Sequence, residues 1–477
     1  MAVATGSLER VPFADRVELR QAGLIGGGLA TALVFGVATG AEPKLTLAAV
    51  FGVIVVYALI AEFSVGLALF IVLQFMIPAL GLAEGTLVKL LGAVLVASWL
   101  LARLSNTTSI SFSRSCPIVA GALVGFLLWG TVTLTWAPSH GAVINALMRY
   151  ALNALLLAMV VAGVRTSKDA KRVAVALSGG AILSAMIALA LSSPGGGASG
   201  DDRLSGAGGD ANEFAVVLAQ GLVLAVGIAG GVLAGRGRRI AFALGALVTA
   251  FALLATLSRG GLVALSSAMI AWVVFSGRWR GRAAFGTVAL LVAGIFWFNA
   301  VATPTARERV ASIAGSSGSQ STSGGTGRTD IWQIGWRAFS EDPITGGGLG
   351  NYIEVTPRFL LAEPGLVRRS DLIIVEPKVA HNMYLHLLVE TGVIGLLLFG
   401  TALVAAIVTA VNGARRWRAR GAGQLELLTR TTVAATLGVL SADFFLSGQY
   451  GRTLWLMLGF CCALGSLSKR ELTVRLR

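Results

Sequence analysis

The sequence predicts an all-α polytopic membrane protein with about 14 (12–14) transmembrane helices and one large extracytoplasmic loop between the eleventh and twelfth spans. Two features of its composition exclude a water-soluble fold: 55% of the residues are hydrophobic and only 13% are charged. These are too few charged residues to cover the solvent-exposed surface of a soluble protein of this size. The apolar runs are close to the roughly 20 residues of a membrane helix and too long for the roughly ten-residue strands of a membrane barrel.

Fourteen apolar windows account for these spans. In chain order, they lie at residues 21–39, 45–61, 65–80, 86–103, 117–136, 143–164, 173–191, 212–234, 240–257, 260–276, 283–301, 383–411, 431–446 and 453–467.

Lysine and arginine are distributed unevenly over the connecting segments. Counted from a cytoplasmic N-terminus, the cytoplasmic tails, loops and span ends hold 24 of the 38 basic residues, the opposite short loops and span ends hold six, and eight lie in one long segment. The positive-inside rule therefore predicts that both termini are cytoplasmic. Since this pattern explains the net charge of +15, we expect no nucleic-acid partner.

The predicted organisation is a cytoplasmic tail (1–20), membrane helices 1–11 (21–301), the large extracytoplasmic loop (302–381), membrane helices 12–14 (382–467) and a second cytoplasmic tail (468–477). We expect no cleavable signal, because the charged residues 1–20 precede an apolar run that leads directly into another span.

The large loop contains two distinguishable parts. Residues 312–327 are rich in Ser and Gly and should be mobile. From Thr329 the apolar residues recur at helical spacing, with Thr329 or Asp330 as the expected N-cap. This helix could lie in the outer membrane interface or pack on a small domain of its own. GGGLGNY (346–352) follows as a turn-rich segment that is too loose for a phosphate-binding fingerprint.

Five segments together resemble the O-antigen ligase and O-antigen polymerase superfamily. They are RLSGAGGDANEFA (203–215), SRGG (258–261), GRTDIW (327–332), GGGLGNY (346–352) and HNMYLHLLVETGVIG (381–395). The resemblance covers about residues 200–400 together with the arrangement of many helices and one large loop.

The resemblance implies an inverting, metal-independent glycosyltransferase. Such an enzyme moves a glycan from an undecaprenyl diphosphate carrier to an acceptor sugar hydroxyl on the outer face of the bacterial inner (plasma) membrane, and it needs no cofactor. The partners would be this lipid-linked donor, a lipid-linked or core-sugar acceptor and the bilayer.

The departing diphosphate requires stabilisation of its negative charge, by a metal ion or by fixed cations. The sequence offers no His/Cys cluster for a metal, and its three cysteines lie in or beside apolar runs. Arg259, Arg328 and Arg203 are all expected near the outer interface, so they are the candidate donor-binding residues. Asn212, which follows Arg203 in the first of the five segments, is a supporting candidate.

His381 is the candidate general base, because it stands immediately before the twelfth span and an imidazole can accept a proton at neutral pH. Asn382 and Tyr384 are supporting neighbours. His386 and Glu390 are four residues apart on one helix face, and we expect a buried hydrogen bond that holds the helix rather than a partner for His381. Trp129 and Trp136 lie at span ends, where an aromatic belt would place them.

Two alternatives stay open. A polysaccharide polymerase of the same family would use the same donor with another lipid-linked glycan as acceptor. A polysaccharide or lipid transporter or flippase would also have many helices, but it should show internal symmetry and midplane charges and would not need a long outer loop.

Overall fold

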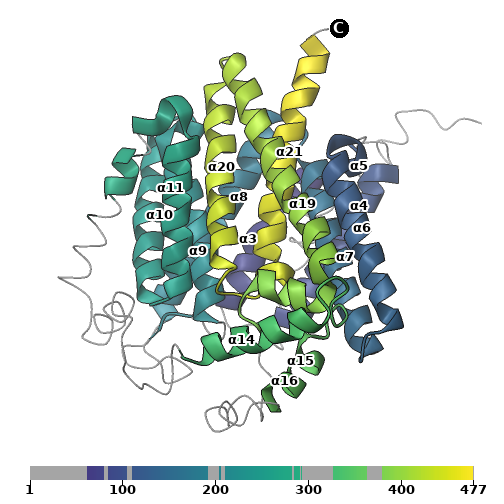
Figure 1. Cartoon of the computed structure of the whole chain (residues 1–477). Coiled ribbons are helices and arrows are strands. Elements are labelled where there is room, and N and C mark those ends of the chain that lie inside the picture. The colour runs from purple at the N-terminus through teal and green to yellow at the C-terminus, as the bar shows by residue number, and fades with distance from the viewer. Residues whose placement is uncertain are drawn as a thin grey trace, which may run out of the picture.

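The computed structural model describes residues 62–79, 84–104, 110–191, 203–205, 210–281, 284–289, 292, 326–361 and 379–475. Within these ranges every regular element is a helix, and the long helices stand side by side in one bundle (Figure 1). The predicted spans 21–39 and 45–61 and the Ser/Gly-rich stretch up to residue 325 lie outside the described residues.

The first half of the bundle contains the helices α3 (Phe63–Ala79), α4 (Glu84–Leu104), α5 (Phe112–Ser115), α6 (Pro117–Val132) with its short continuation η1 (Thr133–Thr135), α7 (His140–Gly163) and α8 (Ser167–Leu191). The middle contains α9 (Ala211–Gly227) with η2 (Ile228–Val232), α10 (Arg236–Ala255), α11 (Arg259–Phe275) and η3 (Gly277–Trp279).

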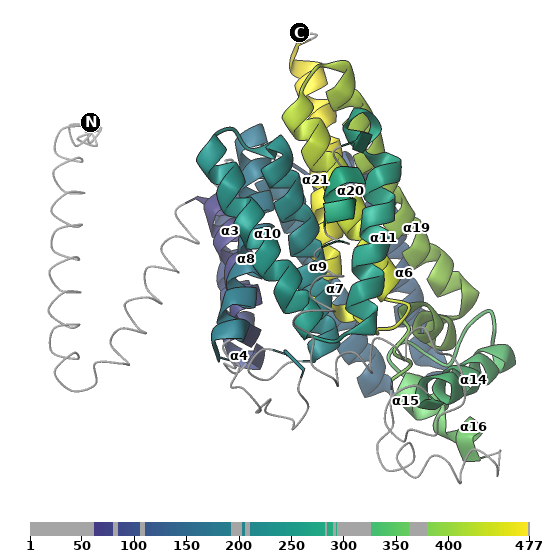
Figure 2. The same ribbon diagram turned by 90° about the vertical axis from the view of Figure 1, so that its left-hand side faces the viewer.

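The remaining elements are α14 (Thr326–Glu341), α15 (Tyr352–Val355), α16 (Pro357–Leu361), α19 (Met383–Ala419), α20 (Gly423–Ala442), η4 (Gly448–Tyr450) and α21 (Arg452–Arg475). In both views α14, α15 and α16 lie at one end of the bundle and the C-terminus lies at the other (Figures 1 and 2). We call these the α14 end and the C-terminal end.

Within the described ranges, six helical segments are long and apolar enough to cross a membrane: Pro117–Thr135, His140–Gly163, Ser167–Leu191, Ala211–Val232, Arg236–Ala255 and Met383–Ala419. The outer faces of these helices carry exposed apolar side chains such as Leu128, Leu152, Leu244 and Leu397. The chain is therefore an all-helical, multi-pass membrane protein, as predicted, while the count of fourteen spans stays a prediction.

Several element boundaries differ from those predicted. The span predicted at 431–446 begins eight residues earlier and ends at Ala442, and the helix predicted from 383 continues past 411 to Ala419. The N-cap prediction at Thr329 or Asp330 is wrong, because α14 begins at Thr326 and includes both residues.

Four helices begin at the α14 end with a side-chain N-cap. Asp210 caps α9, Ser139 caps α7, Ser258 caps α11 and Asn382 caps α19, and in each case a side-chain oxygen accepts a hydrogen bond from a backbone N–H of the first turn. The first-turn amides that cannot bond within a helix are thus partly satisfied, and the starts of these helices are fixed at one end of the bundle.

The bundle interior is closely packed through small residues. A Cβ on Gly221 would lie 2.1 Å from Ala181 Cβ, and one on Gly261 would lie 2.5 Å from Ala215 Cβ. Helices α8, α9 and α11 therefore approach one another at positions where no larger side chain fits, which is a common way for membrane helices to associate.

Candidate functional site

Helix α19 is broken near its start. Gly392 has φ 62° and ψ −168°, a left-handed conformation that favours glycine, and it divides α19 into a short first segment (383–391) and a long second segment (393–419). The first segment carries Tyr384, His386 and Glu390, which the sequence singles out, and Asn382 is its N-cap. The break therefore makes this segment a separate element.

The GGGLGNY segment caps the first segment of α19. Gly347 N donates to Val389 O over 2.8 Å and Gly348 N donates to Glu390 O over 2.9 Å. The indole of Trp129, from α6, donates to Thr391 O over 2.9 Å. These donors satisfy the carbonyls that a helix end leaves without partners. The glycine-rich turn thus serves the helix end.

His386 and Glu390 form the predicted hydrogen bond within this segment. His386 Nε2 and Glu390 Oε1 are 2.9 Å apart, and both side chains are buried. Glu390 Oε1 also accepts from Tyr352 N over 3.2 Å, and the Tyr352 ring stacks on His386 with a centroid distance of 4.8 Å. The pair therefore holds the start of α15 against α19.

His381 lies between two anchored residues and is partly exposed. Ala380 O accepts a 2.9 Å hydrogen bond from the Trp332 indole of α14, and Asn382 Oδ1 accepts from Tyr384 N and Leu385 N at 3.0 Å each. His381 itself has φ 45°, which few non-glycine residues adopt. Such a conformation persists where the neighbouring structure holds it. The backbone position from which the His381 side chain extends is therefore fixed.

The end of α20 supports the same segment from the other side. Asp443 O accepts from Met383 N over 2.8 Å, and Tyr384 donates its hydroxyl to Leu440 O over 2.8 Å. The ring of Tyr384 contacts that of Phe444 at a centroid distance of 4.4 Å. Since its hydroxyl bonds to α20, Tyr384 orients the start of α19.

The segments that contain Arg203 and Arg259 meet at the starts of α9 and α11. Arg203 donates from Nε to Thr256 O over 3.1 Å and from Nη2 to Asn212 Oδ1 over 2.9 Å. The same Asn212 oxygen accepts a 2.9 Å hydrogen bond from Ser258 Oγ, and Ser258 caps α11. Arg259 is the exposed first residue of that helix. The structure thus brings Arg203, Asn212 and Ser258 together and puts Arg259 beside them; we call these four residues the arginine cluster.

A groove lies between α14 and the start of α19. Its volume is about 580 Å³, and its lining is Trp332, Gln333, Trp336, Arg337, Asn382, Tyr384, Leu385 and Leu388. Most of this surface is apolar or aromatic. Arg337 also lines the groove, although it was not among the site residues predicted from the sequence. Trp336 and Arg337 follow Gln333 by three and four residues, so both lie on the same face of α14 as Gln333. Arg328 lies in the first turn of α14, outside the part of that helix whose side chains the structure describes.

Phe445 connects the arginine cluster with the groove. Its ring is 6.3 Å from that of Trp332 between centroids, and a Cβ on Gly260 would lie 3.9 Å from Phe445 Cβ. Gly260 directly follows Arg259. The arginine cluster, His381 and the groove therefore occupy one region at the α14 end of the bundle.

The described part of the chain contains no group of three or more His, Cys, Asp or Glu side chains that could hold a metal ion. Cys116, Cys461 and Cys462 are free thiols buried in the bundle. Arg203 and Arg259 are the cations that the structure places beside Asn212 and Ser258.

The comparison with curated proteins found no match. The comparison with family models matched residues 244–400 to the model described as O-antigen ligase. These residues include Arg259, α14, the GGGLGNY segment, His381 and the whole first segment of α19, whereas Arg203 and Asn212 precede the matched region. This match covers about a third of the chain, and it supports the resemblance of this region to the O-antigen ligase and polymerase superfamily.

Proposed function

We propose that the protein is an inverting, metal-independent glycosyltransferase of the ligase type. It moves a glycan from an undecaprenyl diphosphate carrier to an acceptor sugar hydroxyl at the α14 end, which faces the outside of the bacterial inner membrane. The observation that carries this proposal is that the family match includes His381, Arg259 and the apolar groove, which lie in one region at the α14 end. Arg203 and Asn212 precede the matched residues and join this region through the hydrogen bond between Ser258 and Asn212.

Orientation follows from charge. Among the described residues, the C-terminal end carries Arg165, Lys168, Lys171, Arg172, Arg236, Arg238, Arg239, Arg278, Arg415, Arg416, Arg418 and Arg420 in or beside its loops. The α14 end has far fewer basic residues, so the positive-inside rule supports a cytoplasmic C-terminal end. A positive charge such as Arg259 at the opposite end runs against this rule and is explained by an anionic substrate.

The arginine cluster would bind the diphosphate of the carrier. A guanidinium has five N–H donors, and the two bonds from Arg203 to Thr256 and Asn212 hold its plane and leave further donors for phosphate oxygens. Arg259 lies at the N-terminus of α11, where the helix dipole also favours an anion. Arg328 would approach from α14. Fixed cations in these positions stabilise the charge that grows on the diphosphate as the glycosidic C–O bond breaks.

His381 would act as the general base. The acceptor oxygen attacks the anomeric carbon from the side opposite the diphosphate, its proton passes to the imidazole, and the diphosphate leaves with the bonding electron pair. The configuration at the anomeric carbon is inverted. General bases of this kind contribute about 10²–10⁴ to the rate. The groove between α14 and α19, with Trp332 and Trp336 in its lining, would hold the apolar part of a lipid-linked substrate.

A polymerase would differ only in its acceptor, which would be a second carrier-linked glycan instead of a lipid-anchored core sugar. The test uses the purified protein in proteoliposomes with a carrier-linked glycan as donor. Three reactions are compared: one with a core-sugar acceptor, one without this acceptor, and one with excess carrier-linked glycan in its place. Mass spectrometry of the products would show single addition to the core sugar for a ligase and a ladder of chain lengths for a polymerase.

The configuration of the new linkage, determined by nuclear magnetic resonance, should be opposite to that of the donor. Retention would refute the one-step mechanism. If neither product forms and the carrier-linked glycan instead moves across the bilayer, the protein is a transporter or flippase and the proposal is wrong.

A further inference from the structure

A second charged cavity lies at the C-terminal end of the bundle, away from the candidate active site. It has a volume of about 480 Å³ and lies between the first turns of α8 and the start of α10. Lys168, Lys171, Arg172 and Arg238 line it together with apolar side chains that include Val175 and Phe242. The positive-inside rule accounts for basic residues at this end in general, but it does not require four of them to line one cavity.

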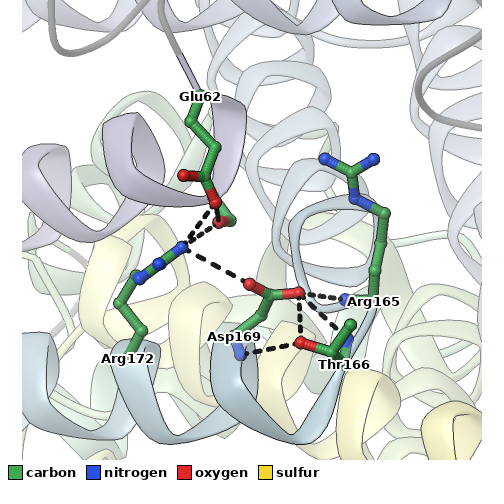
Figure 3. Close-up of polar contacts among 6 residues, drawn as sticks. Glu62, Arg165, Thr166, Asp169 and Arg172 are labelled. Carbon is green, nitrogen blue, oxygen red and sulfur yellow. Dashed lines mark hydrogen bonds and ion pairs between the residues drawn. The ribbon is translucent and has the colours of Figure 1, made fainter.

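One of the four cations is engaged in fixed ion pairs, shown in Figure 3. Arg172 Nη1 lies 2.8 Å from Glu62 Oε1 and 3.4 Å from Asp169 Oδ1. The other oxygen of Asp169 accepts from Thr166 N over 2.9 Å and from Arg165 N over 3.2 Å. The hydrogen bond from Arg172 also lowers the pKa of Glu62. Arg172 and the two carboxylates therefore form a structural unit that connects α3 with α8.

The other three cations leave the cavity with an excess of positive charge. Lys171 Nζ donates to the neutral amide of Gln424 over 2.6 Å. Lys168 and Arg238 are exposed, and neither forms an ion pair with a carboxylate among the residues that the structure describes. Glu62 and Asp169 are the acidic groups at this site, and both are bonded to Arg172.

From the cavity toward the α14 end, the surface of α8 and α10 becomes apolar. Lys168, Arg172, Val175, Gly179, Leu183 and Met186 follow one another at spacings of three and four, so they lie along one face of α8. Leu183 and Met186 are 40% and 51% exposed, and on α10 Ile240, Leu244 and Leu247 are 49–58% exposed. Helices α3, α8 and α10 stand together on one side of the bundle (Figure 2). Cations at the end of a span and exposed apolar side chains along it match a phospholipid, with its phosphate at the level of the headgroups.

We propose that this cavity binds the headgroup phosphate of an anionic phospholipid, with Lys168 and Arg238 as its main contacts and the acyl chains along the exposed faces of α8 and α10. Lys171 adds charge, and Arg172 holds the wall of the site in place. The proposal does not depend on the glycosyltransferase function. A soluble phosphate compound would offer the same phosphate chemistry, but it would make no use of the apolar surface.

The test compares the wild type with two double variants of the full-length protein in detergent micelles. Lys168→Gln with Arg238→Gln removes two charges from the cavity. Arg415→Gln with Arg418→Gln is the control, because it removes two exposed charges from the same end of the bundle, at the end of α19. Binding of phosphatidylglycerol is measured by native mass spectrometry during a lipid titration, and phosphatidylcholine and glycerol 3-phosphate serve as comparison ligands.

We expect the wild type and the Arg415/Arg418 variant to retain phosphatidylglycerol in preference to phosphatidylcholine, and the Lys168/Arg238 variant to bind it at least about tenfold more weakly. Glycerol 3-phosphate should not displace the lipid. The proposal fails if the Lys168/Arg238 variant binds like the wild type, if both double variants weaken binding equally, or if glycerol 3-phosphate competes as well as the lipid. Thermal unfolding without added lipid shows whether each variant is folded, and Lys168→Gln alone replaces the double variant if that one is not.

Discussion

Replacing Gly392 by alanine should destabilise the protein strongly, because both the backbone conformation and the space at this position exclude a Cβ. The added Cβ would lie 2.1 Å from Ile344 O and 2.4 Å from Ile344 C, which are backbone atoms of the turn after α14 and cannot rotate away. The left-handed conformation alone costs a non-glycine residue about 1–2 kcal/mol.

The clash also pushes the GGGLGNY segment away from the helix end. Two hydrogen bonds depend on that contact, from Gly347 N to Val389 O and from Gly348 N to Glu390 O. At about 0.5–1.5 kcal/mol for each, their loss brings the total destabilisation to about 2–5 kcal/mol. Because His381 directly precedes Asn382, the N-cap of the first segment of α19, the same change should also lower the rate of transfer per folded molecule.

The matched control is Gly400→Ala in the second segment of α19. A Cβ at Gly400 meets no atom within 4 Å, and in a helix interior alanine is favoured over glycine by about 1 kcal/mol. Thermal unfolding in detergent, followed by tryptophan fluorescence, should show a midpoint lower by roughly 5 °C or more for Gly392→Ala and unchanged or higher for Gly400→Ala. Equal midpoints for the two variants would refute the helix break and its capping by the glycine-rich turn.

Three further predictions concern the site. Arg259→Lys and Arg328→Lys should each restore little of the activity lost in the alanine variants, because an ammonium lacks the planar fork that holds a diphosphate; wild-type turnover in both lysine variants would show that only charge matters. Transfer by the purified protein should be unaffected by excess EDTA, and a loss that Mg²⁺ or Mn²⁺ restores would overturn the role of the arginines. Asn212→Ala removes the oxygen shared by Arg203 and Ser258, so the KM for the donor should rise roughly tenfold or more, from about 1.5–3 kcal/mol for a hydrogen bond to a charged group, with little change in the unfolding midpoint. An unchanged KM would show that Arg203 does not need this contact.

Patterns within one helix were the most predictable features. The spacing of four between His386 and Glu390 predicted their hydrogen bond correctly, because residues so placed share a helix face whatever surrounds them. The predicted span 143–164 matches α7 at both ends to within three residues. This was predictable because a long apolar run has one favourable structure in a bilayer, the helix.

Features that depend on distant segments could not be predicted. Gly392 stands in an apolar run, where a glycine usually indicates close helix packing, and its left-handed conformation follows from the approach of residues 344–348, more than forty positions earlier. Trp129 and Trp136 have the positions of an aromatic belt, yet their indoles donate to Thr391 O and Gly346 O. The grouping of Arg203 with Asn212 and Ser258 likewise requires the loop after α10 to meet the start of α9, which no local spacing indicates.

The most direct test of the proposed mechanism measures donor binding and chemistry separately on His381→Ala. Donor affinity and single-turnover transfer are determined on the same folded, detergent-solubilised sample and on wild type. If His381 is the general base and the arginines hold the diphosphate, donor affinity should stay within a few-fold of wild type while transfer falls by roughly 10²–10⁴. A transfer rate per folded molecule within a few-fold of wild type would show that His381 only positions the start of α19, and that another group activates the acceptor hydroxyl.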